Sequence, residues 1–446
     1  MKNLRAADPV IFKAIKGEEK RSLEQLEMIP SENYASAAVL QATGSVLANK
    51  YSEGYPGRRY YQGNEWANVV ETEAVERAKK LFRVPYVNVQ PYSGSPANSA
   101  VQFAVLNPGD KIMGLALASG GHLTHGHPQV TFSGRYFKSV QYSVGKDGWL
   151  DYDEIASLVK KEKPKLIIAG TTAYPRILEW KKFAAIADAV GAYLMADIAH
   201  IAGLVVARAH PSPVPHVHIV TTTTHKTLRG PRGAMIMVTK RGLRKDADLP
   251  RKIDSAIIPG LQGGPHNHTT AAIAVALKEA ASKQFTVYSR QIVKNAQVLA
   301  KELIKSGFEL VSGGTDNHLI LVDLRNKGVN GWVAGWALEY AGIILNRNGV
   351  PGDTNPPFYP SGIRMGTPAL TSRGMKEKEM RQIAKWVIEV IEHIKSYQFP
   401  VDSDQRKAFT KNFLVKIRKD KYLARLRREV ARFARRYPVP GITDRR

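Results

Sequence analysis

The sequence predicts an α/β protein whose larger part contains a mainly parallel sheet and whose C-terminal part is a smaller α+β domain. Between residues 165 and 240, strands that are apolar along their whole length alternate with an amphipathic helix. Such strands are typical of a parallel sheet covered on both faces. Near residue 280 this alternation gives way to a different pattern, which marks a second domain. The length of 446 residues also exceeds what one core usually serves.

The elements of the larger domain follow from apolar runs bounded by turn residues. We expect "KLIIAG" to be a strand, "EWKKFAAIADAVG" an amphipathic helix that ends at Gly191, and "AYLMAD" a strand that ends at Asp197. "HIVTTTT" and "AMIMVT" are rich in β-branched or apolar residues and predict two further strands. "TTAAIAVALKEAASKQ" predicts a long helix.

The smaller domain is expected to contain strands at "FELVSGG", "NHLILVDL" and "IILNRN", a helix at "GWVAGWALEYAG" and a final long helix from Lys376. We therefore expect an N-terminal helical arm at 1–30, the large domain at 31–279 and the small domain at 280–446. In the last part of that domain, "KNFLVKIRKDKYLARLRREVARFARRY" spaces its apolar residues at roughly helical intervals. This spacing favours a helix that docks onto a domain.

The chain is strongly basic, with 65 Lys and Arg against 39 Asp and Glu and a net charge of +26. From Val401 onward, the chain contains 15 basic and 5 acidic residues. This tail either attracts a polyanion, such as nucleic acid, a membrane surface or an acidic substrate, or is the solvated face of a docked helix. The absence of cysteine excludes disulfides, thiolate catalysis and zinc held by sulfur, and it is compatible with an intracellular site.

Targeting signals are not visible in the sequence. The first twenty residues mix both charge signs and lack the apolar region of a secretory signal. The most apolar stretch is interrupted by Asp197 and His200, which argues against a membrane span. We expect a cytoplasmic protein.

The stretch "YSGSPAN" places Ser93, Gly94 and Ser95 directly before a helix that Pro96 can open in its first turn. Backbone N–H groups at a helix start, together with two hydroxyls, could hold a phosphate. The same pattern is also typical of a plain helix cap. The pattern alone does not separate these two readings.

Histidines gather in "SGGHLTHGH" and in "DIAH", so a metal site has to be considered. Neither an HExxH pattern nor an acidic cluster accompanies them, and nothing completes a ligand shell. His122, bracketed by glycines, could instead lie flat against a planar ligand. His125 and His127 could equally be ordinary loop residues.

Asp197 and Lys226 are the strongest candidates for chemistry. A carboxylate at a strand end is costly to bury unless it meets a positive partner, which could be a protonated pyridine nitrogen or an arginine. Lys226 follows the strand "TTTT" and precedes a glycine-bracketed turn, as a Schiff-base nucleophile would. A salt-bridging surface lysine is the alternative.

The segment Tyr51 to Gly63, "YSEGYPGRRYYQG", holds four tyrosines, two arginines and one acid. So many aromatic residues are unusual for a solvent loop. Glu53 could be an acid/base group with a raised pKa, or the ion partner of Arg58 or Arg59.

Read together, nine stretches resemble serine hydroxymethyltransferases, which are pyridoxal-phosphate enzymes of the aspartate-aminotransferase fold type. They are "IPSENY", "NKYSEGYPGRRYYQG", "NVQPYSGSPAN", "GGHLTHG", "ADIAHIAGL", "TTTTHKTLRGPRG", "QGGP", "SGGTDNHLILVDL" and "SGIRMGTPALTSRG", in the order found in that family. The resemblance implies fold type I, with a mostly parallel seven-stranded sheet flanked by helices and a smaller C-terminal α+β domain.

For the cofactor, the resemblance implies that Lys226 carries pyridoxal 5′-phosphate as a covalent aldimine, that Asp197 pairs with the pyridinium nitrogen and that His122 stacks on the ring. The ring surroundings would also include Thr172, His200, Thr223, His225 and Arg232. Ser93, Gly94 and Ser95 would bind the phosphate, and Tyr51 and Gly264 would reach in from the second subunit of a homodimer. A tetramer is compatible with the same contacts.

For the substrates, the resemblance implies that Arg364 and Ser31 bind the amino-acid carboxylate, with Tyr51, Tyr61 and His200 nearby. Glu53 would pass a proton at the serine hydroxymethyl group. The folate site would comprise Tyr60, Leu117, Gly121, Leu123 and Asn348. The implied reaction converts serine and tetrahydrofolate to glycine and methylenetetrahydrofolate. A threonine or β-hydroxy-amino-acid aldolase, an aminotransferase, a metal hydrolase and a nucleic-acid-binding protein are the alternatives.

Three positions depart from the family pattern. Pro96 stands where glutamine is usual, Leu261 replaces a glycine and Tyr92 replaces a histidine. Pro96 removes one backbone N–H and one amide near the phosphate, which would weaken cofactor binding by about 1 kcal/mol.

Overall fold

The computed structural model describes residues 2–445, which fall into two units. Unit 1 contains the residues up to Ala37, Lys294–Gly314 and the residues from His318 onward; unit 2 contains Ala38–Val293 and Thr315–Asn317. The division of the chain therefore lies within helix α13 (Lys283–Lys305), whereas the sequence suggested a boundary near residue 280. The N-terminal residues, expected as an arm, belong to unit 1.

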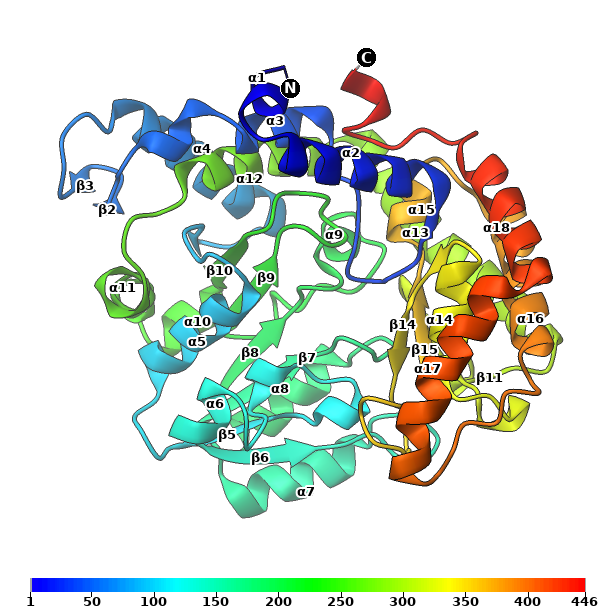
Figure 1. Cartoon of the computed structure of the whole chain (residues 1–446). Coiled ribbons are helices and arrows are strands. Elements are labelled where there is room, and N and C mark those ends of the chain that lie inside the picture. The colour runs from blue at the N-terminus through cyan, green and yellow to red at the C-terminus, as the bar shows by residue number, and fades with distance from the viewer. Residues whose placement is uncertain (1, 446) are drawn as a thin grey trace. The chain divides into compact units, whose positions relative to one another are not determined.

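Unit 2 is built on a seven-stranded sheet in the order β4-β10-β9-β8-β7-β5-β6 (Figure 1). The strands are β4 (Tyr86–Asn88), β5 (Lys111–Leu115), β6 (Lys138–Tyr142), β7 (Leu166–Gly170), β8 (Tyr193–Asp197), β9 (Ile219–Thr223) and β10 (Ala234–Val238). The run from β9 through β8, β7 and β5 to β6 is parallel, as the apolar strands predicted. Strand β10, by contrast, is antiparallel to both β9 and β4. Residues 224–233 leave no room for a crossover helix, so β10 returns beside β9.

Both faces of this sheet are covered, because alternate strand residues enter different apolar cores. Met113, Ile167 and Leu194 pack with α4, α7, α8 and α12, whereas the neighbouring Ile112 and Ile168 pack with α5 and α11. The helices of unit 2 include α4 (Glu65–Phe82), α5 (Gly94–Val105), α6 (Phe132–Tyr136), α7 (Tyr152–Glu162), α8 (Trp180–Asp188), α9 (Ala202–Val206), α10 (Lys240–Lys245), α11 (Leu249–Ser255) and α12 (Asn267–Ala280). Strands β2 (Gly54–Tyr55) and β3 (Arg58–Arg59) form a small hairpin, and α3 (Ala37–Thr43) begins at the unit boundary.

Two predicted helices of this region end earlier than their apolar pattern suggested. The Ala-rich helix stops at Ala280 instead of running to Gln284. Ser282 then accepts a hydrogen bond from the backbone N–H of Phe285 at 3.1 Å, so a new helix, α13, starts there. Helix α8 ends at Asp188, and the chain reaches Gly191, which has a φ of 68°, through a turn.

Unit 1 contains an antiparallel sheet in the order β11-β12-β15-β14 and the parallel pair β1–β13. The strands are β1 (Leu26–Glu27), β11 (Glu309–Leu310), β12 (Leu319–Asp323), β13 (Ile343–Ile344), β14 (Asn346–Asn348) and β15 (Gly362–Gly366). The segment "IILNRN" thus forms two short strands rather than one. The helices are α1 (Lys2–Ala7), α2 (Pro9–Glu24), α14 (Gly331–Tyr340), α15 (Pro368–Ser372), α16 (Glu377–His393), α17 (Ser403–Lys419) and α18 (Lys421–Ala434).

The basic tail forms two helices rather than one, because Asp420 interrupts the helical run. Its Oδ1 accepts the N–H of Leu423 at 2.9 Å and so caps α18. Both helices bury apolar residues in the core of unit 1, among them Phe413, Ile417 and Val430. The docking interpretation of their spacing is confirmed. No helix within residues 2–445 has both the length and the apolar character needed to cross a membrane.

Candidate active site

The carboxyl ends of four parallel strands bring most of the predicted site residues to one edge of the sheet in unit 2. Asp197 is the last residue of β8, and it is in register with Gly170 of β7 and Thr221 of β9. His122 follows β5, Thr172 follows β7 and Lys226 follows β9. Such an edge is where ligands bind in open α/β sheets.

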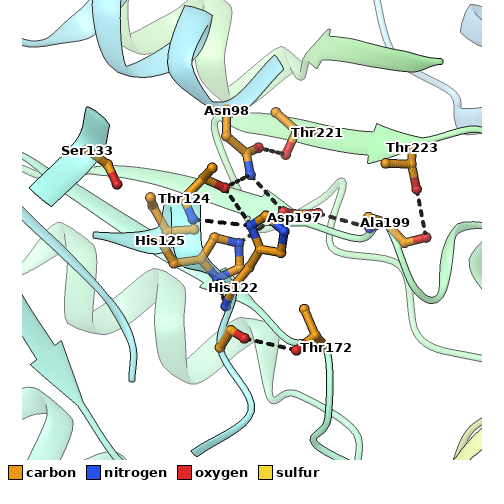
Figure 2. Close-up of polar contacts among 12 residues, drawn as sticks. Asn98, His122, Thr124, His125, Ser133, Thr172, Asp197, Ala199, Thr221 and Thr223 are labelled. Atoms are coloured by element: carbon orange, nitrogen blue, oxygen red, sulfur yellow. Dashed lines mark hydrogen bonds and ion pairs between the residues drawn. The ribbon is translucent and has the colours of Figure 1, made fainter. Parts of the chain in front are cut away.

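Asp197 is surrounded by hydrogen-bond donors (Figure 2). Its Oδ2 accepts from the amide of Asn98 and from Nε2 of His125, both at 2.9 Å, and its Oδ1 accepts from the N–H of Ala199 at 3.0 Å. Burial alone would raise the pKa of this carboxyl, but the hydrogen bonds from His125 and Asn98, together with the electrostatic effects of His125 and His122, outweigh burial and hold the pKa well below its usual range. Asp197 is therefore ionised at neutral pH.

His125 is a site residue that the sequence left undecided. Its side chain is 1% exposed, and the backbone N–H of His122 donates to its Nδ1 at 3.3 Å. Because Nδ1 accepts this hydrogen bond, Nε2 is the ring nitrogen that donates to Asp197. His127, the other undecided histidine, has only a 3.5 Å contact from the N–H of Gln129 to its Nδ1.

His122 is held as a neutral ring. The N–H of Thr124 donates to its Nδ1 at 3.2 Å, and the Thr124 hydroxyl lies 2.8 Å from the same atom. Burial lowers the pKa of His122 to about 4, helped by the charges of His125 and Lys226 and opposed by that of Asp197. The Asn98 amide also donates to the Thr124 hydroxyl at 2.9 Å, so one amide connects His122 with Asp197.

Lys226 lies beside the segment that follows Asp197, because the two stretches are joined by hydrogen bonds. The hydroxyl of Thr227 donates to the carbonyl of His200 and accepts from the N–H of Gly203, both at 3.0 Å. Nearer the sheet, the hydroxyl of Thr223, the last residue of β9, donates to the carbonyl of Ala199 at 3.4 Å. These bonds align "DIAHIAG" with "TTHKT".

His225 lies close enough to Lys226 and Arg232 for their positive charges to affect its pKa. Burial lowers the pKa of His225 to about 3, and the charges of Lys226 and Arg232 act in the same direction. The Nδ1 atom of His225 is buried and has no hydrogen-bond partner among the described residues. Arg232 itself is exposed.

The N-terminus of α5 packs against the end of β9. A Cβ at Gly94 would lie 2.8 Å from Cγ2 of Thr223, so the close approach requires glycine here. Ser93 is the N-cap residue, but its side chain makes no capping hydrogen bond, which argues against the plain cap. Ser95 is exposed, and Pro96 is the third helical residue. The backbone N–H groups of this first turn have no partners within the helix.

Gly121 and Thr172 join the loops after β5 and β7. The Thr172 hydroxyl donates to the carbonyl of Gly121 at 2.9 Å (Figure 2, dashed line at Thr172). A Cβ at Gly121 would lie 1.9 Å from the carbonyl oxygen of Leu115, so only glycine fits. Leu117 and Leu123 are exposed beside this loop.

Tyr51, Glu53, Tyr61 and Gly264 gather in a second cluster. The rings of Tyr51 and Tyr61 meet edge to face at 5.6 Å, and a Cβ at Gly264 would lie 3.0 Å from the Tyr51 ring. The charge of Glu53, and the hydrogen bond it accepts, raise the pKa of Tyr51. Tyr60 is also exposed.

The alternative partners considered for Glu53 are engaged elsewhere. Arg59 pairs with the buried carboxylate of Glu71 at 2.6 Å, and Arg58 lies 3.8 Å from Asp254. The ion-pair interpretation of Glu53 is therefore wrong.

Three predicted residues lie in unit 1. The Nε of Arg364, in β15, donates to Oδ1 of Asn346 at 3.0 Å, and burial lowers the pKa of the Arg364 guanidinium to about 10. Asn348, in β14, donates to the carbonyl of Gly349 at 2.8 Å. Ser31 is half-buried.

A metal site finds no support in the part of the chain that the structure describes, since no three His, Asp or Glu side chains are grouped to hold an ion. Instead, Asp197 has His125 and Asn98 as partners.

Comparison with known proteins identifies the family. The family model described as serine hydroxymethyltransferase matches residues 4–387, a range that ends before α17 and α18. The serine hydroxymethyltransferase of Acidothermus cellulolyticus is 60% identical over 388 residues, which cover 87% of this chain and 89% of the relative. That of Desulfotalea psychrophila is 56% identical over 380 residues, covering 85% and 88%. That of Sorangium cellulosum is 52% identical over 443 residues, covering 99% and 97%. The chain belongs to the serine hydroxymethyltransferase family.

Proposed function

We infer that the chain is a serine hydroxymethyltransferase, a one-carbon transferase that uses pyridoxal 5′-phosphate and tetrahydrofolate. It reversibly transfers the hydroxymethyl carbon of serine to tetrahydrofolate and gives glycine, methylenetetrahydrofolate and water. The observation that carries this inference is the ionised Asp197 at the same sheet edge as Lys226, in a chain that belongs to this family.

The residues at this edge fit the cofactor. Asp197 offers a buried carboxylate to a protonated ring nitrogen, the N-terminus of α5 offers N–H groups to a phosphate, and His122 offers a neutral ring. The buried Nδ1 of His225 has no hydrogen-bond partner within residues 2–445, which supports a further polar group at this site. When bound, pyridoxal phosphate supplies an electron sink for a bond broken at the substrate α carbon.

Each residue near the ring has a proposed task. Lys226 forms the covalent bond to the cofactor through Nζ. Asp197 keeps a proton on the ring nitrogen, and His122 stacks on the ring. Thr172, His200 and Thr223 would contact the edge of the ring. His225 and Arg232 would lie near Lys226. The phosphate would be bound by Ser93, Gly94 and Ser95.

Substrate binding is assigned to unit 1 residues. We propose that Arg364 binds the serine carboxylate through its guanidinium fork, with the Ser31 hydroxyl beside it. The support is the burial that lowers the pKa of Arg364, since a bound carboxylate would offset that burial. Asn346 fixes the Arg364 Nε and so orients the fork.

We assign proton transfer to Glu53 of the second cluster, and folate binding to exposed residues of the neighbouring loops. Glu53 exchanges a proton at the serine hydroxyl, next to Tyr61. The exposed rings and side chains at Tyr60, Leu117 and Leu123 offer apolar surface to folate. Gly121 and Asn348 complete the proposed folate contacts.

We propose a homodimer in which Tyr51 and Gly264 serve the partner's cofactor. Large aromatic side chains are exposed in this region, with Tyr51, Tyr60 and Trp66 at 56%, 70% and 69%. Exposed aromatic side chains are enriched at protein–protein interfaces, which supports this proposal.

The test is glycine formation from serine with and without tetrahydrofolate. We expect turnover that requires tetrahydrofolate, and we expect Glu53→Gln to retain the bound cofactor while losing this turnover. Cleavage of serine at an equal rate without tetrahydrofolate would contradict the proposal.

A further inference from the structure

A pocket of about 470 Å³ lies in unit 2, and none of its residues belongs to the site assigned above. We call it the basic pocket. It is lined by Arg77, Lys80, Leu81, Phe82, Arg83, Val205, Val206, Arg208, Ser212, Leu277, Lys278 and Ala281.

The basic pocket forms where the C-terminal ends of three helices meet. Helix α4 ends at Phe82, α9 at Val206 and α12 at Ala280. The side chains of Phe82, Val205 and Leu277 are buried, and they give the pocket an apolar floor. The exposed cations surround this floor.

The cations of the pocket are mostly not neutralised by carboxylates. Within residues 2–445, Lys80, Arg83, Arg208 and Lys278 form no ion pair, and the lining contains no Asp or Glu. Arg77 differs, because it lies 2.7 Å from Glu73 and donates to the carbonyl of Ala274 at 2.8 Å.

Helix ends account for only part of this charge. Each helix C-terminus carries roughly half a negative charge, so three of them offset about 1.5 charges. The four unpaired cations exceed that value by about 2.5 charges, and they border an apolar floor. Charge and floor together favour a ligand that is both anionic and apolar.

The basic pocket lies at the opposite end of α4 from Trp66, an exposed residue of the proposed dimer surface. Trp66 lies in the first turn of α4, and Lys80 lies in its last turn. At 1.5 Å per residue, the two positions are about 21 Å apart along the helix.

We propose that the basic pocket binds a small amphiphilic organic anion, whose apolar body lies on Leu81, Val206 and Leu277 and whose anionic group faces Lys80, Arg83 and Lys278. The volume suits a ligand of this class, since small-molecule pockets measure roughly 300–1,000 Å³. This proposal is independent of the catalytic roles proposed above for Lys226 and the residues around it.

The test uses anilinonaphthalene sulfonate, an aromatic sulfonate, as a fluorescent probe of the cofactor-loaded chain. We expect saturable binding at one site per chain, competition by laurate, and little competition by inorganic phosphate at the same concentration. Lys80→Glu/Lys278→Glu should weaken binding by about tenfold or more, as expected for lost charge-assisted contacts. Ala281→Trp, which fills the pocket without changing charge, should weaken it as well.

The matched control is Lys160→Glu/Lys161→Glu, which makes the same charge change in the last turn of α7. It should leave the dissociation constant within about twofold. All three variants should keep wild-type serine turnover, which shows that they are folded. Equal probe binding in the wild type and the Lys80→Glu/Lys278→Glu variant would overturn the proposal, as would Ala281→Trp leaving binding unchanged. Equal competition by phosphate and laurate would show an anion site without the apolar contribution and would also overturn it.

Discussion

The Nε2 atom of His125 donates to Oδ2 of Asp197 at 2.9 Å, and the backbone of His122 fixes the tautomer that makes this possible. The pair keeps a buried carboxylate ionised at the end of a central strand. A loop histidine thus sets the charge state of the residue proposed to face the cofactor nitrogen.

Replacing His125 by Ala should weaken cofactor binding. Asp197 would lose the donor that most lowers its pKa, and hydrogen bonds to charged groups contribute about 1.5–3 kcal/mol. We therefore expect the dissociation constant for pyridoxal phosphate, measured by titration of the apoenzyme, to rise by roughly 10–100-fold. His127→Ala is the control and should bind normally. Equal affinities for the two variants would show that the His125 contact does not matter.

Replacing Arg364 by Lys should raise the KM for serine more than it lowers kcat. Lysine retains the charge but cannot form the bidentate fork, so an increase of about tenfold is expected. Arg347→Lys on the neighbouring strand β14 is the matched control. Steady-state kinetics at saturating tetrahydrofolate would measure both. An unchanged KM in Arg364→Lys would remove the residue from the substrate site.

Replacing Tyr92 by Phe should destabilise the fold modestly. The Tyr92 hydroxyl donates to the carbonyl of Gly264 at 2.8 Å, and its ring stacks on His266 at 4.1 Å. Removing only the hydroxyl should lower the free energy of unfolding by about 1 kcal/mol, measured with urea. The exposed Tyr136→Phe should change stability little, and a similar loss in both variants would argue against the contact.

Stability should fall as the pH drops from about 6.5 to 4. His218 is 4% exposed, its Nδ1 accepts the N–H of Leu194 at 2.9 Å, and burial, with the charges of Arg241 and Lys245, lowers its pKa to about 4. In this window the unfolded chain binds a proton that folded His218 does not. His218→Gln should reduce the slope of unfolding free energy against pH by at most about 1.4 kcal/mol per unit. His216→Gln is the control, and identical slopes in both variants would contradict this account.

Sequence alone predicted the residues that end strands. Asp197 ends one buried strand and Lys226 lies shortly after another, and parallel strands bring such residues to one edge. His125 was not assigned, because a loop histidine gives no sign of which carboxylate it will meet. Asn98 was missed as a site residue, although an amide between Ala97 and Val101 on a buried helix face is a visible signal. The partners of the cations were not predicted either, since the partner of Arg59 is Glu71, 12 residues further along the chain in α4.

The proposed covalent attachment of the cofactor to Lys226 is tested most directly by borohydride reduction of the cofactor-loaded chain, followed by digestion and mass spectrometry of the peptides. We expect the phosphopyridoxyl group on the peptide that contains Lys226, and no labelled peptide and no serine turnover in Lys226→Ala, with the far-ultraviolet circular dichroism unchanged. A label on another lysine in the wild type, or full folate-dependent turnover in Lys226→Ala, would contradict the account.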